Sequence, residues 1–131
     1  KGDDYMLSEL MGKGLCTVDY YMKAIDYMRK HINNPHFYVF TDNPCWVKDN
    51  LPEFEYMLVD WNEVSGKRNF RDMQLMSCAK HNIIGNSTYS WWAAWLNANQ
   101  DKIVVGPKRF FNPINSFFST CDIMCEDWIS L

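Results

Sequence analysis

The chain has 131 residues, of which 47% are hydrophobic and 16% aromatic, so it is long enough for one hydrophobic core and too short for two. Its formal net charge of -3, from 13 basic and 16 acidic side chains, gives no basic field for nucleic acid or for an anionic membrane. We therefore expect a single domain over residues 1–131 that binds no nucleic acid, and any phosphate group must be held by local contacts.

Cysteine and histidine usage also excludes two kinds of site. The five cysteines include no C-x-x-C pair and the three histidines are scattered, so we expect neither a disulfide framework nor a zinc site. Cys16, Cys45 and Cys78 have apolar neighbours and are predicted to be small core residues.

No stretch reaches the roughly 20 apolar residues of a membrane span, and the first residues do not resemble a signal peptide. We expect the chain as given to be soluble.

The first predicted elements are a helix and a strand. Thr17 is a candidate N-cap, and an apolar face at helical spacing follows it, made of Val18, Tyr21, Met22, Ile25, Met28 and Ile32. Residues 36–42 form a β-branched and aromatic run that ends at Asn43-Pro44, which predicts a buried strand. Asp42 lies at its carboxyl end, where the ligand crevice of an open parallel sheet is found. The alternative is that Asp42 caps a helix over residues 46–50.

A second strand is predicted over residues 55–60, followed by a polar loop. Lys67 and Arg68 in this loop form the densest pair of positive charges in the chain, and they could close over a phosphate or could simply be solvated surface. The next helix carries Phe70, Met73, Met76 and Ala79 at helical spacing. Asp72 near its start is placed where a carboxylate suits the helix dipole.

A short strand, a polar elbow and a helix come next. Ile83-Ile84 is closed by Gly85-Asn86, which fits a buried strand ending in a turn. The helix after Ser87 or Thr88 is apolar on two sides and is therefore predicted to be buried. Backbone N-H groups and two hydroxyls at its start would form an anion site, unless Ser87 and Thr88 serve only as caps.

The last clear strand is predicted over residues 102–107, and a tail rich in phenylalanine is expected to pack back onto the sheet. Four predicted strands thus alternate with helices, which indicates an α/β fold: a Rossmann-like, open parallel sheet flanked by helices. The carboxyl ends of its strands are the expected place for a ligand.

Three segments of the chain resemble the hallmark block of the α-1,2-fucosyltransferases, glycosyltransferase family 11. They are Asp-Met-Gln-Leu-Met at 72–76, Cys-Ala-Lys-His-Asn-Ile-Ile at 78–84 and Asn-Ser-Thr-Tyr-Ser-Trp-Trp-Ala-Ala-Trp-Leu-Asn at 86–97. The resemblance extends more loosely over nearly the whole chain. It implies that Asp72 accepts hydrogen bonds from the guanine base, whose adjacent N-H and amino groups match a carboxylate.

The resemblance also implies a reaction and a set of ligands. The expected activity is transfer of L-fucose from GDP-β-L-fucose to the 2-hydroxyl of a galactose-terminated glycan, with inversion and without a metal or other cofactor. Candidate residues for the phosphate cradle are Asn86, Ser87, Thr88 and Ser90, with Thr88 the first inside the helix. The chain would be the donor-binding half of an enzyme with two Rossmann-like domains of the GT-B kind, and the acceptor-binding half would lie upstream.

The first residues look like the end of a longer motif. Lys1-Gly2-Asp3 is similar to the tail of the family's His-x-Arg-Arg-Gly-Asp-Tyr segment, with Lys1 in place of the second arginine. The histidine and the first arginine would precede this chain, so we expect a fragment that has little or no activity alone. Asp3 is a candidate general base and equally a candidate structural hydrogen-bond acceptor.

The sequence therefore leaves two interpretations of the chain open. The alternative to a transferase is a non-catalytic module that binds a nucleotide sugar or a protein, which the missing histidine and arginine would favour for the fragment. For a bacterial transferase of this family we expect a location in the cytoplasm or at the cytoplasmic face of the membrane. For a full-length eukaryotic homologue we expect the Golgi lumen.

Overall fold

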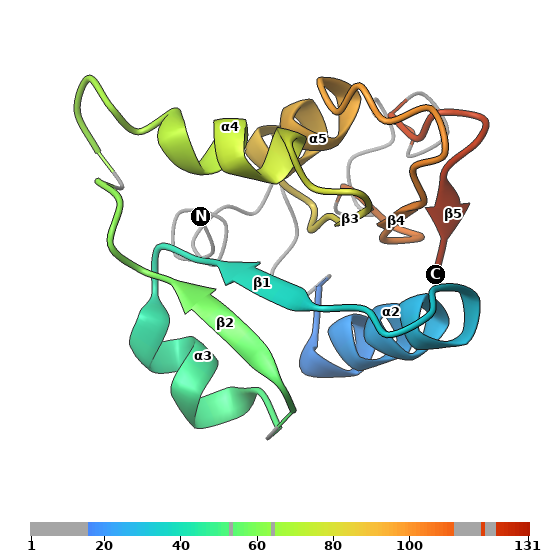
Figure 1. Cartoon of the computed structure of the whole chain (residues 1–131), viewed down its shortest axis with the longest axis horizontal. Helices are drawn as coiled ribbons and strands as arrows, with labels where there is room; N and C mark the ends of the chain where they lie inside the picture. The colour runs from blue at the N-terminus through green and yellow to red at the C-terminus, as the bar shows by residue number, and fades with distance from the viewer. Residues whose placement is uncertain (1–15, 53, 64, 112–118, 120–122) are drawn as a thin grey trace.

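The computed structural model describes residues 16–52, 54–63, 65–111, 119 and 123–131. Strands and helices alternate along most of this chain, as predicted (Figure 1). The elements in chain order are α2 (Val18–His31), β1 (Phe37–Phe40), α3 (Pro44–Asn50), β2 (Tyr56–Val59), α4 (Arg71–Ser77), β3 (Asn82–Ile83), α5 (Thr88–Trp95), β4 (Val104–Gly106) and β5 (Ile129–Ser130).

The described strands pair in parallel, which confirms the predicted α/β class with parallel strands. They do not form the one open sheet that we expected: β1 pairs with β2, and β4 lies between β3 and β5 in a separate three-stranded sheet. The shortness of β3 explains part of this division, since two residues offer few ladder hydrogen bonds. The N-H of Ile84 just after β3 donates to the carbonyl of Val105, at 2.9 Å.

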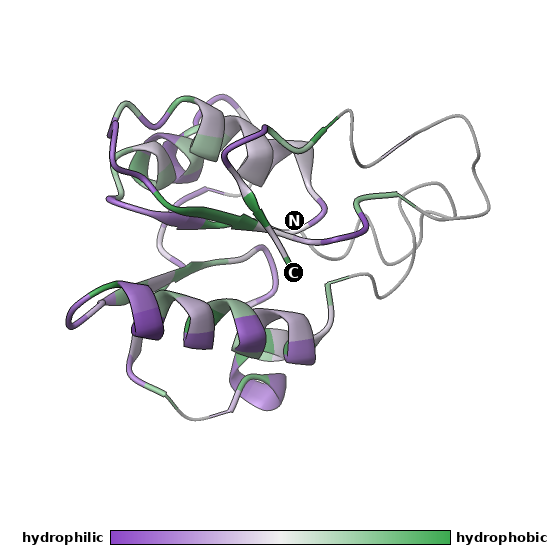
Figure 2. Cartoon of the chain, turned by 90° about the vertical axis from the view of Figure 1, so that its right-hand side faces the viewer, coloured by the Kyte–Doolittle hydropathy of each residue, from purple (hydrophilic) through white to green (hydrophobic). Residues whose placement is uncertain are grey.

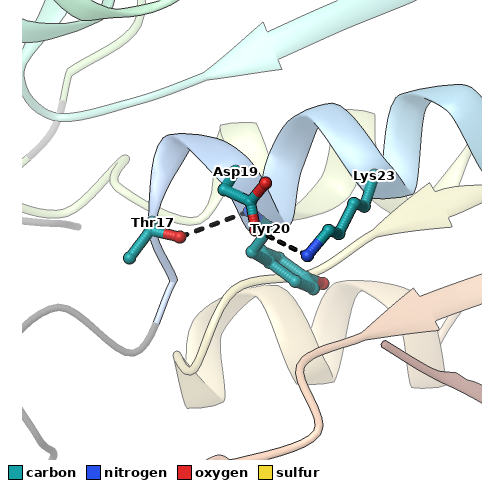
Figure 3. A network of polar contacts seen from close by, with 4 residues as sticks. All are labelled: Thr17, Asp19, Tyr20 and Lys23. Atoms are coloured by element: carbon teal, nitrogen blue, oxygen red, sulfur yellow. Dashed lines mark hydrogen bonds and ion pairs between the residues drawn. The ribbon is translucent and has the colours of Figure 1, made fainter.

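Helix α2 begins where the sequence predicted. The Thr17 hydroxyl accepts from the N-H of Tyr20 at 3.3 Å, and Asp19 in the first turn pairs with Lys23 at 2.7 Å (Figure 3). Tyr20 is itself buried, and its hydroxyl donates to the carbonyl of Ile84 at 2.6 Å. This bond ties α2 to the end of β3. Ala24 and Met28 further along α2 form a core cluster with Val105 of β4.

Helix α5 is less buried than predicted. Ala93 and Ala94 are fully buried, whereas Trp92, Trp95 and Leu96 are 48%, 53% and 57% exposed. The helix has only eight residues, and its alanine side packs closely against Ile84 and Val104. The larger side chains therefore lie around that contact: Trp91 packs against this core cluster with Trp128, and Trp95 stacks on Trp91 with ring centroids 5.3 Å apart.

The structure also corrects expectations about the burial of the cysteines and of strand β1. Cys45 and Cys78 are exposed rather than core residues, and Cys16 is partly buried. Strand β1 is only partly covered, since Tyr38 is 58% exposed and its neighbour in the register, Met57 of β2, is 53% exposed. An unbroken apolar run carries no period that shows which face is covered, which is why the sequence overstated the burial of β1.

Hydropathy follows the layers of the fold. Figure 2 shows hydrophobic strand segments between helices that alternate hydrophilic and hydrophobic stretches. Across the described residues, no helix combines the length and the apolar character that crossing a bilayer requires.

Candidate functional site

A cavity of about 1130 Å³ lies between the β1–β2 part of the molecule and the part that contains α2, α4 and β3. Segments that follow β1, β2 and β3 reach it, as expected for the carboxyl ends of parallel strands. Most of the predicted site residues line it, namely Asp42, Asp72, Asn86, Ser87 and Ser90. Thr88 is the first residue of α5 and is exposed, but it is not among the lining residues. Asp3 lies outside the described residues.

The elbow between β3 and α5 has the predicted form of a strand that turns into a helix start. Ser87 occupies the N-cap position with an extended backbone, and within the described part of the chain its side chain makes no hydrogen bond to the first turn. The hydroxyl of Ser87 is therefore not used for capping. The hydroxyl of Ser90 instead donates to the Ser87 carbonyl at 2.9 Å, so in this arrangement Ser90 shapes the elbow rather than donating to a ligand.

The start of α2 closes the elbow from one side. The N-H of Asn86 donates to the Cys16 sulfur at 3.2 Å, so one elbow amide already has a partner. Burial raises the pKa of Cys16 to about 11, although the hydrogen bond from Asn86 opposes this shift. A Cβ atom added to Gly85 would lie 2.9 Å from the Tyr21 hydroxyl oxygen, so a larger residue here would force Tyr21 or the elbow to shift. Sequence reasoning missed Cys16 and Tyr21, because only the tertiary fold brings them here.

Asp72 lies in the first turn of α4, as predicted, and lines the cavity. Its Oδ1 atom accepts from the side-chain amide of Asn62 at 2.7 Å. Asn62 comes from the loop after β2, so two elements that are separate in the sequence fix this carboxylate. Sequence reasoning did not single out Asn62, although its place just after a strand was a usable signal.

The hydroxyl of Tyr89 joins the start of α4 to the start of α5. It accepts from the N-H of Met73 at 2.9 Å and donates to the carbonyl of Asn69 at 2.5 Å. Burial raises the pKa of Tyr89, and the nearby charge of Asp72 acts in the same direction, while the bond from Met73 opposes both. The sequence did not predict this role of Tyr89, since the position of Tyr89 in the sequence gave no sign of the contact with α4.

Other polar residues predicted near the site divide into two groups. The capping alternative for Asp42 is wrong, because the side chain of the next residue, Asn43, accepts from the N-H of Trp46 at 3.0 Å and so caps α3. Asp42 itself lines the cavity. Lys67 and Arg68 are exposed, and neither lines the cavity.

A buried pair of asparagines, Asn82 and Asn97, joins α4, β3 and the segment that follows α5. The Asn97 side chain, 4% exposed, donates to Oδ1 of Asn82 at 2.7 Å and to the carbonyl of Ala79 at 2.8 Å. Asn82 in turn donates to the carbonyl of Met76 near the end of α4, at 2.9 Å. Buried amides that are hydrogen-bonded in this way fix the arrangement of the elements that they join. The pair therefore holds α4 against the start of β3 and the end of α5.

A smaller cavity of about 630 Å³ lies beside the start of α2, and it carries positive charge. Lys108 and Arg109, which follow β4, line it together with Lys23. The ion pair of Lys23 with Asp19, visible in Figure 3, offsets part of that charge. Among the described residues, no group of three His, Cys, Asp or Glu side chains is arranged to hold a metal ion.

Comparison with known families identifies the chain. The model of glycosyl transferase family 11 matches residues 3–131. The chain belongs to glycosyl transferase family 11. This confirms the resemblance carried by the segments at 72–76, 78–84 and 86–97, and it places the elbow and Asp72 within a glycosyltransferase sequence.

Curated relatives of this family 11 chain support the assignment. The O-antigen biosynthesis glycosyltransferase WbnK of Escherichia coli is 39% identical over 98% of the chain, and an α-1,2-colitosyltransferase of Escherichia coli is 38% identical over 90% of it. The galactoside 2-α-L-fucosyltransferase SEC1 of Bos taurus is 27% identical over 73% of the chain. The chain spans 41%, 40% and 26% of the lengths of these relatives, respectively. No solved structure matches it.

Proposed function

We propose that the protein transfers L-fucose from GDP-β-L-fucose to the 2-hydroxyl of a galactoside, and that this chain is the donor-binding half of the enzyme. The linkage would be α-1,2, with inversion at the anomeric carbon. A second Rossmann-like domain, outside this chain, would bind the acceptor glycan, as in a GT-B-like enzyme. The location that fits a bacterial enzyme of this kind is the cytoplasm or the cytoplasmic face of the membrane.

One observation carries the proposal: Asp72 and the elbow residues line the same cavity, at the carboxyl ends of the strands. The start of α5 offers backbone N-H groups and the positive end of a helix dipole, which suit a diphosphate. Asp72 offers a carboxylate, which suits the N-H and amino groups of guanine. A nucleoside diphosphate has these two features at its two ends. Asn86, Ser87 and Asp42, which also line the cavity, complete the proposed donor contacts, with Ser90 supporting the elbow. Thr88, at the start of α5, is a proposed contact that does not line the cavity.

The proposed step exchanges one bond at the anomeric carbon for another. The bond from that carbon to the diphosphate oxygen breaks, and a bond to the acceptor 2-hydroxyl oxygen forms on the opposite face. The electron pair leaves with GDP, and the hydroxyl proton passes to a general base, for which Asp3 is the candidate in this chain. In our proposal no metal takes part, because hydrogen-bond donors at the helix start and basic side chains stabilise the leaving diphosphate.

A second donor sugar has specific support from the comparisons. One relative that is 38% identical to the chain is named as an α-1,2-colitosyltransferase, whereas the fucosyltransferase SEC1 is 27% identical. Colitosyl transfer is therefore the second candidate activity. Assays of the full-length protein with GDP-fucose and with GDP-colitose, each with a galactoside acceptor, separate the two by which donor gives product. The absence of product from either would favour a non-catalytic nucleotide-sugar-binding module.

Calorimetric titration of the full-length protein with GDP, GDP-fucose and ADP tests the donor site. We expect GDP to bind more tightly than ADP. We expect Asp72→Asn to weaken GDP binding about 10- to 100-fold, because hydrogen bonds to charged groups contribute about 1.5–3 kcal/mol. ADP binding should hardly change in this variant.

The matched control is Asp101→Asn, which removes an exposed carboxylate that does not line the cavity. This variant should bind GDP like the unsubstituted protein. Equal affinity of the unsubstituted protein for GDP and ADP would refute the proposed role of Asp72.

A further inference from the structure

We infer that Tyr89 is a positioning residue for base recognition, because its hydroxyl fixes the start of α4, and with it Asp72, relative to the diphosphate-binding elbow. The inference rests on the proposed function and extends it to a residue that would not touch the nucleotide. It concerns the discrimination between guanine and adenine rather than the affinity for phosphate.

The first turn of α4 has an unusual cap. Its N-cap residue is Phe70, and within the described residues no side chain at that position bonds to the helix start. A helix normally satisfies its N2 or N3 amide with a serine, threonine, aspartate or asparagine at the N-cap. Here the N-H of Met73, the third residue of α4, donates to the hydroxyl of Tyr89 instead, at 2.9 Å. The cap is therefore supplied by the neighbouring helix.

The same hydroxyl holds the chain on the other side of Asp72. It donates to the carbonyl of Asn69 at 2.5 Å, so Tyr89 contacts the backbone both before and after the carboxylate. Since the pKa of Tyr89 is raised, chiefly by burial, the hydroxyl keeps its proton at neutral pH and both bonds persist. The side chain of Asn62 then orients the carboxylate itself, at 2.7 Å from Oδ1.

This hydroxyl links the two ends of the proposed donor site. Tyr89 is the second residue of α5, next to Thr88 and two residues after Ser87, and α5 packs against α4 (Figure 1). The base and the diphosphate of a nucleotide are joined through ribose, so their binding groups must lie at a matching separation. In enzymes, a displacement of about 1 Å can lower the reaction rate about 100-fold, which shows how sensitive such positioning is. Releasing the start of α4 from α5 should therefore weaken the contact with the base and leave the phosphate contacts in place.

The test is Tyr89→Phe in the full-length protein, titrated with GDP, ADP and inorganic pyrophosphate. The aromatic ring stays, and only the hydroxyl that contacts Met73 and Asn69 is lost. We expect the affinity for GDP to fall about tenfold, while the affinities for ADP and pyrophosphate stay within about twofold of their original values. The preference for GDP over ADP should thus fall about tenfold.

Two further variants make the result specific. Tyr20→Phe also removes a hydroxyl that makes a buried hydrogen bond, to the carbonyl of Ile84, and it should lower the melting temperature without changing the GDP-to-ADP ratio. Tyr89→Phe added to Asp72→Asn should reduce the preference for GDP no further, because the residue that Tyr89 positions has already lost its charge.

Three results would overturn the inference. An unchanged GDP-to-ADP ratio in Tyr89→Phe, with an unsubstituted protein that prefers GDP, refutes the positioning role alone. An equal loss of affinity for GDP, ADP and pyrophosphate would show that the hydroxyl only stabilises the fold. If the unsubstituted protein does not prefer GDP, the proposed base contact fails, and the role of Tyr89 fails with it.

Discussion

The two sheets differ sharply in how fully their side chains are covered. In the three-stranded sheet, Val105 and the neighbouring Ile84 are fully buried, under α2 on one side and α5 on the other. In the two-stranded sheet, Tyr38 and Met57 are each more than half exposed, and both line the large cavity. Both sheets are parallel, so pairing geometry does not explain the difference.

The difference in burial shows that the two sheets have different structural roles. The three-stranded sheet provides a close-packed support from which the elbow projects, and close-packed interiors resist displacement. The two-stranded sheet leaves apolar side chains beside the cavity, where a ligand or another part of the protein can cover them. The elbow, which is our proposed diphosphate site, therefore projects from the more rigid of the two supports.

The largest difference in the free energy of unfolding is expected between a variant at a buried residue beside the three-stranded sheet and one at an exposed residue of the two-stranded sheet. Ile84→Ala should lower the free energy of unfolding by about 2–5 kcal/mol, because it leaves a cavity between α5 and β4. Met57→Ala removes a side chain that is 53% exposed and should cost less than about 1 kcal/mol. Urea unfolding measures both values. Similar losses in the two variants would show that the β1–β2 sheet is packed as tightly as the other.

The sequence predicted most of the described helices and strands because their signals are local, but it did not predict β5, which pairs with β4. Thr17 caps α2 as predicted, and the strand that ends at the Gly85-Asn86 turn leads into a helix with Ser87 at its N-cap. Helical spacing, caps and turn residues lie within a few positions of one another, so a single sequence contains them.

Features that depend on distant parts of the chain were not predicted. The division into two sheets, the exposure of Trp92 and the hydrogen bond from Met73 to Tyr89 all depend on which elements become neighbours. Asp42 and the elbow residues could be chosen from their places at strand ends, and Asp72 from the family resemblance, and most of these candidates do line one cavity. Their partners, such as Asn62 for Asp72, became apparent only in three dimensions.

A smaller effect is expected at the junction of the well-packed sheet and the elbow. Gly85→Ala should destabilise the protein by about 1–3 kcal/mol, because the new methyl group would lie 2.9 Å from the Tyr21 hydroxyl oxygen. Adding Tyr21→Phe removes that oxygen and should recover part of the loss. Unfolding of both single variants and the double variant gives the coupling energy. Additive losses would contradict the predicted contact.

The smallest effect concerns the dependence of stability on pH, and it contrasts Cys16 beside the elbow with Cys45 on α3. Burial raises the pKa of Cys16 from 9.0 to about 11 in the folded protein, so between these values the folded state keeps a proton that the unfolded state has lost. The stabilising contribution is therefore complete below about pH 9 and is lost as the pH rises toward 11.

Urea unfolding at several pH values from 8 to 10 measures this decline. Cys16→Ala should make the decline in unfolding free energy with pH shallower, because the titrating thiol is gone. The variant also loses the hydrogen bond from Asn86, but this loss lowers the free energy of unfolding by the same amount at each pH. Cys45→Ala removes an exposed thiol and should leave the slope unchanged. Tyr20 and Tyr21 also have raised pKa values, chiefly through burial and in smaller part through Cys16, but in the folded protein they lose their protons above the measured pH range. Equal slopes in the two variants would place Cys16 in water rather than against the elbow.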